Sequence, residues 1–204
     1  MQPFEELNTL SETIHDVLAH ANRLGQVPIV IGNFSLSLMG FPVLTQDVGL
    51  FLFEGEKHAI DLAGECCVAG YTPRQEFVFR HPNQGFIQLH HRTSKGNLVQ
   101  VDIMFPRNKD VLWRSLNSGA RQESSKDWKL RYRIPTLADL LLLKALAGRP
   151  RDFSVIATLV AERPQQIDLH RIHRVLDQSK IIPATHRRKL LELLADIKKS
   201  RWRG

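Results

Sequence analysis

The sequence predicts a mixed α/β (α+β) fold, in which a mixed sheet is flanked by helices and followed by a C-terminal helical bundle. Helical and strand-like hydrophobic periodicities alternate between residues 4 and 105, whereas only helical periodicity occurs from residue 134 onward. The 204 residues are 43% hydrophobic and 24% charged, which is typical of soluble globular proteins with a packed core. We therefore expect an α/β core over residues 1–133 and a helical domain over residues 134–204.

The N-terminal part begins with an amphipathic helix over residues 4–24, which Gly25 ends. A short buried strand at 28–31 ends at Gly32, and one or two helical turns are expected at 33–39. A strand over 47–53 and a helix over 56–69 follow. Three strand-like segments then lie at 75–80, 85–92 and 98–105, and the loop between the last two contains Gly96, which indicates a hairpin.

The C-terminal part begins with a clear helix start. Thr136 is the expected N-cap, and Asp139 supplies an acid three residues later. This helix ends at Gly148-Arg149-Pro150, and further helices are expected near 151–162, 167–177 and 184–199.

Charge is distributed unevenly along the chain. The 28 Lys and Arg residues exceed the 21 Asp and Glu residues, so the net charge is +7, yet residues 1–128 carry −3 and residues 129–204 carry +10. An excess of this kind suggests an anionic partner, either nucleic acid or an acidic protein. The last helix and its continuation hold the candidate nucleic-acid contacts, although a solvated helix face explains them as well: Arg187, Arg188, Lys198, Lys199, Arg201 and Trp202.

Several classes of protein are not expected. No apolar run approaches the roughly 18 residues of a membrane span, and the N-terminus lacks the pattern of a signal peptide. The two cysteines, Cys66 and Cys67, are adjacent and are expected to be reduced thiols, so we expect a cytoplasmic protein.

A set of short motifs carries the functional hypothesis. The first strand runs into Gly32-Asn33-Phe34-Ser35, and Thr45-Gln46-Asp47-Val48-Gly49 follows. The strand over 98–105 holds a single acid, Asp102, on the face opposite its apolar residues. Leu140-Leu141-Leu142-Leu143-Lys144 and Ala147-Gly148-Arg149-Pro150-Arg151-Asp152 come later. In this order and spacing the motifs, over roughly residues 25–160, resemble the minimal nucleotidyltransferase fold, in particular the bacterial group related to toxins of abortive-infection toxin–antitoxin systems.

The resemblance implies Mg²⁺-dependent transfer of a nucleoside monophosphate from a nucleoside triphosphate to a hydroxyl acceptor. Asp47 and Asp102 would then be the catalytic residues and would hold Mg²⁺, with Asp102 as the general base. The residues implied to contact the nucleotide are Gly32, Asn33, Ser35, Thr45 and Lys144.

The sequence departs from the family pattern where a second acid is expected. Asp-x-Asp places two carboxylates on one face of a strand, and a third strand completes a cage for two Mg²⁺ ions. Here Gly49 replaces the second Asp, Asn33 replaces a glycine and Val155 replaces the last Asp of the helical motif. We therefore expect a degenerate nucleotidyltransferase-like protein, with weak or lost transfer. The alternative is a non-catalytic protein whose basic helical half binds nucleic acid, a nucleotide or a partner.

Structural roles compete with the site roles at four of these residues. Asp47 is either a site residue or a turn residue after Thr45, and Asp102 is either a site residue or a solvated outward acid. Lys144 lies in an apolar stripe, so it either faces the site or extends to the surface. Asp152 is also explained as a first-turn acid that complements the helix dipole.

Overall fold

The computed structural model describes residues 3–43, 45–74, 78–124 and 129–201, and the chain divides into two compact units. Unit 1 comprises residues 1–109 and 120–135, and unit 2 comprises residues 110–119 and 136–204. The chain passes from unit 1 into unit 2 for the last time after residue 135, two residues from the boundary expected at 133. The chain also enters unit 2 earlier, for a ten-residue excursion that the hydrophobic pattern does not indicate.

Unit 1 contains an eight-stranded mixed sheet in the order β3-β5-β6-β2-β1-β8-β7, with β4 also paired to β5. The β2–β6 and β1–β8 pairs are parallel and the other pairs are antiparallel. This confirms the predicted mixed α/β (α+β) architecture. The elements of the unit are α1 (Pro3–Arg23), β1 (Ile29–Ile31), α2 (Gly32–Leu38), β2 (Asp47–Phe51), α3 (Glu56–Val68), β3 (Thr72–Pro73), β4 (Phe79–Arg80), β5 (Gln84–Arg92), β6 (Leu98–Pro106), β7 (Arg121–Ser124) and β8 (Arg131–Ile134).

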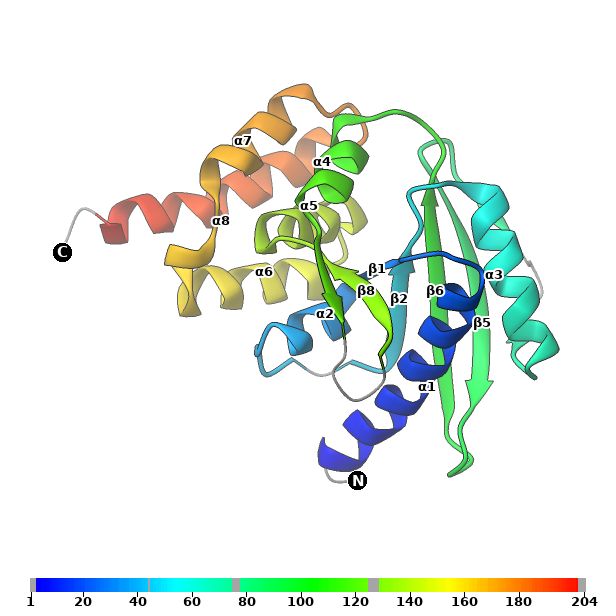
Figure 1. Cartoon of the computed structure of the whole chain (residues 1–204). Coiled ribbons are helices and arrows are strands. Elements are labelled where there is room, and N and C mark those ends of the chain that lie inside the picture. Colours follow the sequence, from blue (N-terminus) through cyan, green and yellow to red (C-terminus); the bar gives the residue numbers. More distant parts are fainter. Residues whose placement is uncertain (1–2, 44, 75–77, 125–128, 202–204) are drawn as a thin grey trace. The chain divides into compact units, whose positions relative to one another are not determined.

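One face of this sheet packs against α1 and α3, which lie over the strands in Figure 1. Val101, Ile103 and Phe105 of β6 are fully buried there, as the alternation along the sequence predicted. Complete burial of such a side chain contributes about 1.5–3 kcal/mol, so this layer stabilises the unit and fixes which face each strand residue occupies.

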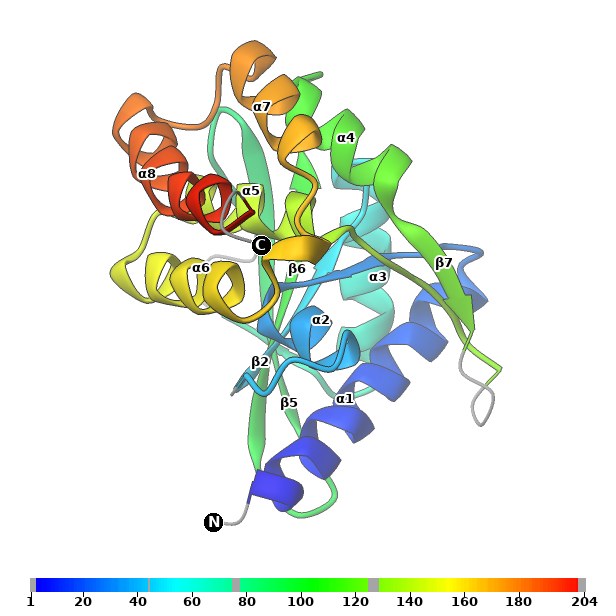
Figure 2. The ribbon, with the colours of Figure 1, turned by 90° about the vertical axis from the view of Figure 1, so that its left-hand side faces the viewer.

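The described part of unit 2 contains five α-helices and a 3₁₀ turn, and α5 contacts α6, α7 and α8, which lie around it in Figure 2. Its elements are α4 (Val111–Gly119), α5 (Leu137–Ala147), α6 (Pro150–Glu162), η1 (Pro164–Gln166), α7 (Leu169–Gln178) and α8 (Ala184–Arg201). The predicted start of α5 is confirmed, because Thr136 Oγ1 accepts a hydrogen bond from the Asp139 amide at 3.1 Å.

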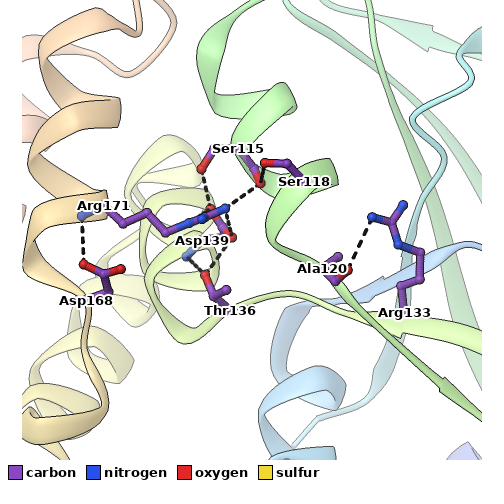
Figure 3. A network of polar contacts seen from close by, with 8 residues as sticks. All are labelled: Ser115, Ser118, Ala120, Arg133, Thr136, Asp139, Asp168 and Arg171. Carbon is purple, nitrogen blue, oxygen red and sulfur yellow. Dashed lines mark hydrogen bonds and ion pairs between the residues drawn. The ribbon is translucent and has the colours of Figure 1, made fainter.

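A buried carboxylate joins three helices of unit 2 (Figure 3). Asp139, which is fully buried, accepts hydrogen bonds from the Ser115 and Thr136 hydroxyls at 2.9 and 2.6 Å. Arg171 of α7 contacts both of its oxygens, at 3.0 Å through Nε and 2.9 Å through Nη2. The first-turn acid of α5 is therefore also the polar link between α4, α5 and α7.

Five elements were absent from the expectation, namely β3, α4, β7, β8 and the 3₁₀ turn η1. β7 contains only polar residues, and β8 is only four residues long, with Tyr132 and Ile134 alternating with Arg131 and Arg133, so neither strand has the longer apolar alternation that marks a strand in a sequence. Of the strand expected at 75–80, only Phe79–Arg80 forms β4, and residues 75–77 lie outside the described residues. No helix in the described part of the chain has the length and apolar character required to cross a membrane.

Candidate functional site

The predicted acids Asp47 and Asp102 lie on the sheet face opposite α1 and α3. In the parallel β2–β6 pair, Asp47 is opposite Gln100 and Gly49 is opposite Asp102. Side chains of aligned positions share a face, so the two acids are diagonal neighbours. A strand spacing of about 4.8 Å and a rise of about 3.3 Å per residue put their Cα atoms about 8 Å apart. The fold therefore brings the two carboxylate-bearing positions together within unit 1.

Asp47 is held at the start of β2 by Thr45. The Thr45 hydroxyl, in a buried side chain, donates to Asp47 Oδ1 and lies 3.0 Å from both that oxygen and the Asp47 carbonyl oxygen. Thr45 was predicted to contact a nucleotide. In the structure its hydroxyl contacts Asp47. The arrangement orients the carboxylate and leaves it half-buried.

Asp102 accepts hydrogen bonds from two glutamine side chains. Gln88 Nε2 donates to Asp102 Oδ1 at 2.8 Å, and Gln100 Nε2 lies 3.1 and 3.0 Å from the two carboxylate oxygens. Arg74 Nη1 donates to Gln88 Oε1 at 2.7 Å. Sequence reasoning missed these residues. Gln100 could have been found as the same-face neighbour two positions before Asp102, and Gln88 from the register of the predicted hairpin.

A side chain at the place of the missing second acid would be crowded. A Cβ atom on Gly49 would lie 3.0 Å from Ile31 Cγ1 and 3.2 Å from the Ile31 carbonyl oxygen. The described residues contain no group of three His, Cys, Asp or Glu side chains that could hold a metal ion. Two oxygen-donor carboxylates fit one hard cation such as Mg²⁺, whereas a two-ion centre lacks its third carboxylate.

The predicted phosphate-binding segment lies at the same end of the sheet. Ile31 pairs with Gly49, and Gly32 then adopts φ +76°, in the left-handed region that favours glycine, as the chain enters α2. Asn33 and Ser35 lie in this seven-residue helix. The Ser35 side chain is fully buried, and its hydroxyl has no hydrogen-bond partner among the described residues.

Lys144 lies in unit 2 and contacts Asp152 of its own motif. Its Nζ atom is 3.6 Å from Asp152 Oδ1, and Arg149 Nε is 2.6 Å from Asp152 Oδ2. The Lys144 and Asp152 side chains are only 8% and 4% exposed, so the lysine does not extend into solvent and the acid is more than a surface first-turn residue. The helical motif therefore builds a buried ionic cluster that ties α5 to α6.

The basic residues of α8 have different roles. Arg187 donates to the backbone carbonyls of Leu176, Ser179 and Ile182, so its guanidinium caps the end of α7 and the following loop instead of facing a ligand. Arg188 is exposed and lies 3.7 Å from Glu192. Lys198, Lys199 and Arg201 lie within α8, but their side chains are outside the described part, as is Trp202 altogether.

Comparison with solved structures identifies the fold. A Helicobacter pylori protein described as a "putative nucleotidyltransferase" aligns at a TM-score of 0.52 with 13% identity, over 93% of this chain and 94% of its own. A second Helicobacter pylori protein, JHP933, aligns at 0.53 with 11% identity, over 96% and 91%. A Thermotoga maritima protein with the same description as the first aligns at 0.50 with 15% identity, over 80% and 97%.

The chain thus has a nucleotidyltransferase-like fold, as the motif order predicted. At these identities the similarity defines the fold alone. A scan of the sequence against protein-family models gave no match, and a search of curated proteins gave none either.

Proposed function

We propose that the chain is a nucleotidyltransferase-like protein that binds a nucleoside triphosphate on the polar face of unit 1 and transfers the nucleotidyl group weakly or not at all. The observation that carries this proposal is the diagonal placement of Asp47 and Asp102 on one face of β2 and β6, with Ile31 crowding the Cβ position from which a third carboxylate would extend. Two free cysteines, Cys66 and Cys67, favour a reducing, cytoplasmic setting.

In this proposal the triphosphate binds where β1 turns into α2. Gly32 lets the backbone approach the phosphates, and the Asn33 side chain donates a hydrogen bond to a phosphate oxygen, whereas the fully buried Ser35 hydroxyl does not reach a bound phosphate. One Mg²⁺ ion at the two carboxylates would neutralise phosphate charge. Asp102 would accept the proton of an attacking hydroxyl, and loss of the third carboxylate makes that chemistry slow.

The test measures binding and transfer separately. Calorimetry with ATP, GTP, CTP and UTP should show binding of at least one triphosphate that requires Mg²⁺. The isosteric variant Asp47→Asn should lose it, whereas Asp61→Asn, at an exposed position of α3, should retain it. Label transfer from each radiolabelled triphosphate to RNA and protein acceptors should stay near background. The absence of Mg²⁺-dependent binding would refute the proposal, and rapid transfer that depends on both acids would refute its degenerate part.

A second function is favoured by the charge of unit 2. The sequence of unit 1 holds 13 basic and 13 acidic residues, whereas that of unit 2 holds 15 and 8, so the whole net charge of +7 belongs to unit 2. This excess supports binding of nucleic acid or of an acidic partner such as an antitoxin, which the bacterial toxin-like resemblance implies.

Salt dependence tests this second function. Fluorescence anisotropy with labelled RNA and DNA should give a log–log slope of affinity against salt of several units, because each phosphate contact releases a counterion. The double variant Arg188→Ala/Lys189→Ala should reduce the slope, and Lys57→Ala in unit 1 should not. An affinity that does not change with salt concentration would contradict a phosphate-binding surface on α8. So would a slope of affinity against salt that both variants leave unchanged.

A further inference from the structure

An apolar row crosses the polar face of unit 1 beside the two acids. Phe79 of β4 is directly opposite Phe86 of β5, and Phe86 is directly opposite Met104 of β6. Gln88, two positions after Phe86, donates to Asp102, so the row and this acid share one face of the sheet. Met104 is only 6% exposed, whereas Phe79 is 54% exposed. The row therefore ends in an aromatic ring that a ligand can reach.

The position of Phe79 distinguishes it from other exposed apolar side chains. A single exposed apolar residue is ordinary in a folded protein, and Val68 at the end of α3 is more exposed, at 89%. Phe79, however, has a second aromatic residue opposite it, with Cβ atoms about 4.5–5.5 Å apart. Phe86 is in turn a diagonal neighbour of Asp102, at about 7–8 Å. Two phenylalanines thus lie next to a candidate site acid.

Arg74 adds a positive charge beside this row. Its amide donates to the Gln88 carbonyl at 3.1 Å, and its Nη1 atom donates to Gln88 Oε1 at 2.7 Å. The guanidinium therefore lies beside Gln88 on the polar face, and the Arg74 side chain is exposed. A guanidinium carries five N–H donors in a planar fork that suits phosphate. An aromatic surface and a phosphate-binding group consequently lie about 7 Å apart along β5.

These groups lie on one side of the two acids, and the predicted phosphate-binding turn lies on the other. In the sheet, β1 adjoins β2 and leads into Gly32, whereas β5 adjoins β6 and carries β3 and β4 beyond it. The proposed triphosphate binds at the end of β1. A molecule whose hydroxyl is to attack it near Asp102 therefore has β5 and β4 beneath it.

We propose that Phe79 and Phe86 form a platform on which a base of a single-stranded nucleic acid stacks, and that Arg74 binds a phosphate next to that base. This inference rests on the proposed function, which assigns the acceptor hydroxyl to this face, and it specifies the class of acceptor. Stacking accepts every base, because every base has a π-face. The platform makes affinity depend on the presence of bases, whereas a basic surface on α8 responds to phosphates alone.

The experiment compares two probes of equal length and charge by fluorescence anisotropy: a short labelled oligouridylate and its abasic counterpart. The wild type should bind the probe with bases about tenfold more tightly or better. Phe79→Ala should bring this ratio close to one. Phe79→Leu, which is apolar but not aromatic, should do the same, and Phe79→Trp should retain the ratio. Val68→Ala, at an exposed apolar residue of α3, should leave it unchanged.

Arg74→Ala tests the phosphate contact separately. It should weaken the binding of both probes by the same factor and leave their ratio intact, because both carry the same phosphates. The matched control is Arg80→Ala, at the position after Phe79, where the side chain pairs with Glu56 of α3. This variant should bind both probes as the wild type does.

Two results would overturn the platform: a wild-type ratio close to one, or a ratio that Phe79→Ala leaves unchanged. If Phe79→Ala does not fold, as judged by circular dichroism, Phe79→Leu and Phe79→Trp decide the question. A chain that binds a triphosphate with Mg²⁺ but does not distinguish the probes would refute the platform and leave the proposed function intact. A base-dependent affinity that needs Phe79, in a chain that binds no triphosphate, would refute the proposed function and leave the platform intact.

Discussion

Gly49 occupies the position where the family pattern has a second acid, so this one residue limits the number of carboxylates at the candidate site. We predict that Gly49→Asp lowers the free energy of unfolding by about 1–3 kcal/mol, because its Cβ would be 3.0 Å from Ile31 Cγ1 in a packed strand pair. Urea unfolding measures this change. Gly49→Asp/Ile31→Ala removes the side-chain part of that crowding and should bind Mn²⁺ more tightly than Ile31→Ala alone.

The control for Gly49 is another glycine with open space. A Cβ on Gly64, within α3, would meet nothing within 4 Å, so Gly64→Ala should stabilise the protein by about 0.5–1 kcal/mol. A Gly49→Asp variant as stable as the wild type would show that the Ile31 side chain moves aside at no cost in free energy. Packing would then not exclude a third acid.

The two cysteines are predicted to differ in reactivity. Burial in the α1–α3 layer raises the pKa of the Cys66 thiol to about 12, and burial also raises the pKa of Cys67, which remains half-buried. Because only the thiolate reacts, Cys66 should be inert to a disulfide reagent at pH 8 until the protein unfolds. Thiol titration of Cys67→Ser with and without urea measures this, and rapid native labelling of that variant would contradict the burial of Cys66.

Local residue patterns predicted on which side of its own strand each acid lies, but not that the two acids are neighbours or what surrounds them. Alternation along β2 and β6 placed Asp47 and Asp102 correctly relative to the core. The contacts of Asp102 depend on strand pairing, and Gln88 is separated from it by 14 positions. The packing of Ile31 against Gly49 likewise appears only when β1 and β2 are paired in register. The contacts of Asp102 and the packing at Gly49 both depend on the pairing of strands that are distant in the sequence, and for this reason the sequence alone did not predict them.

At the scale of elements, the Asp139 network joins α4, α5 and α7. We predict that Asp139→Ala destabilises the protein by about 3–5 kcal/mol, since it leaves Arg171, whose side chain is 15% exposed, without its buried partner. Urea unfolding measures the loss. Replacing both residues, in Asp139→Ala/Arg171→Met, should recover part of the stability.

An N-cap of the same unit provides the comparison for Asp139. Asp168 accepts a hydrogen bond from the Arg171 amide at the exposed start of α7, so Asp168→Ala should cost only about 1 kcal/mol. Equal losses for Asp139→Ala and Asp168→Ala would show that the buried network adds nothing beyond a helix cap.

Elements with an apolar face were predictable, and elements defined by pairing were not. The helices over α1, α3 and α5 to α8 follow periodicity and end signals, as do β5 and β6. β7 and β8 have only four residues each: β7 is entirely polar, and the alternation of Tyr132 and Ile134 with two arginines in β8 is too short to predict a strand. Arg121 and Arg131 illustrate this, because both are exposed strand residues that a sequence pattern assigns to a loop.

At the scale of the whole molecule, the chain crosses between its units three times. It enters unit 2 for α4, returns to unit 1 for β7 and β8, and re-enters unit 2 at residue 136. The sequence suggested a single boundary because the all-helical pattern and the charge excess both begin near residue 130. The nine residues of α4 stand apart from that pattern, although they bury Leu112, Trp113 and Leu116.

This path predicts that the C-terminal helices do not fold alone. A fragment over residues 136–204 lacks α4, so Asp139 loses the Ser115 hydroxyl and the apolar surfaces of α5 and α7 that face α4 are exposed. We expect a loosely packed helical state that binds a hydrophobic dye and unfolds without a cooperative transition. A second fragment, with residues 110–119 joined to residue 136 through a flexible linker, should bind less dye and unfold more cooperatively. A cooperative transition in the shorter fragment would show that α4 is dispensable and that the boundary near residue 133 marks an independent domain.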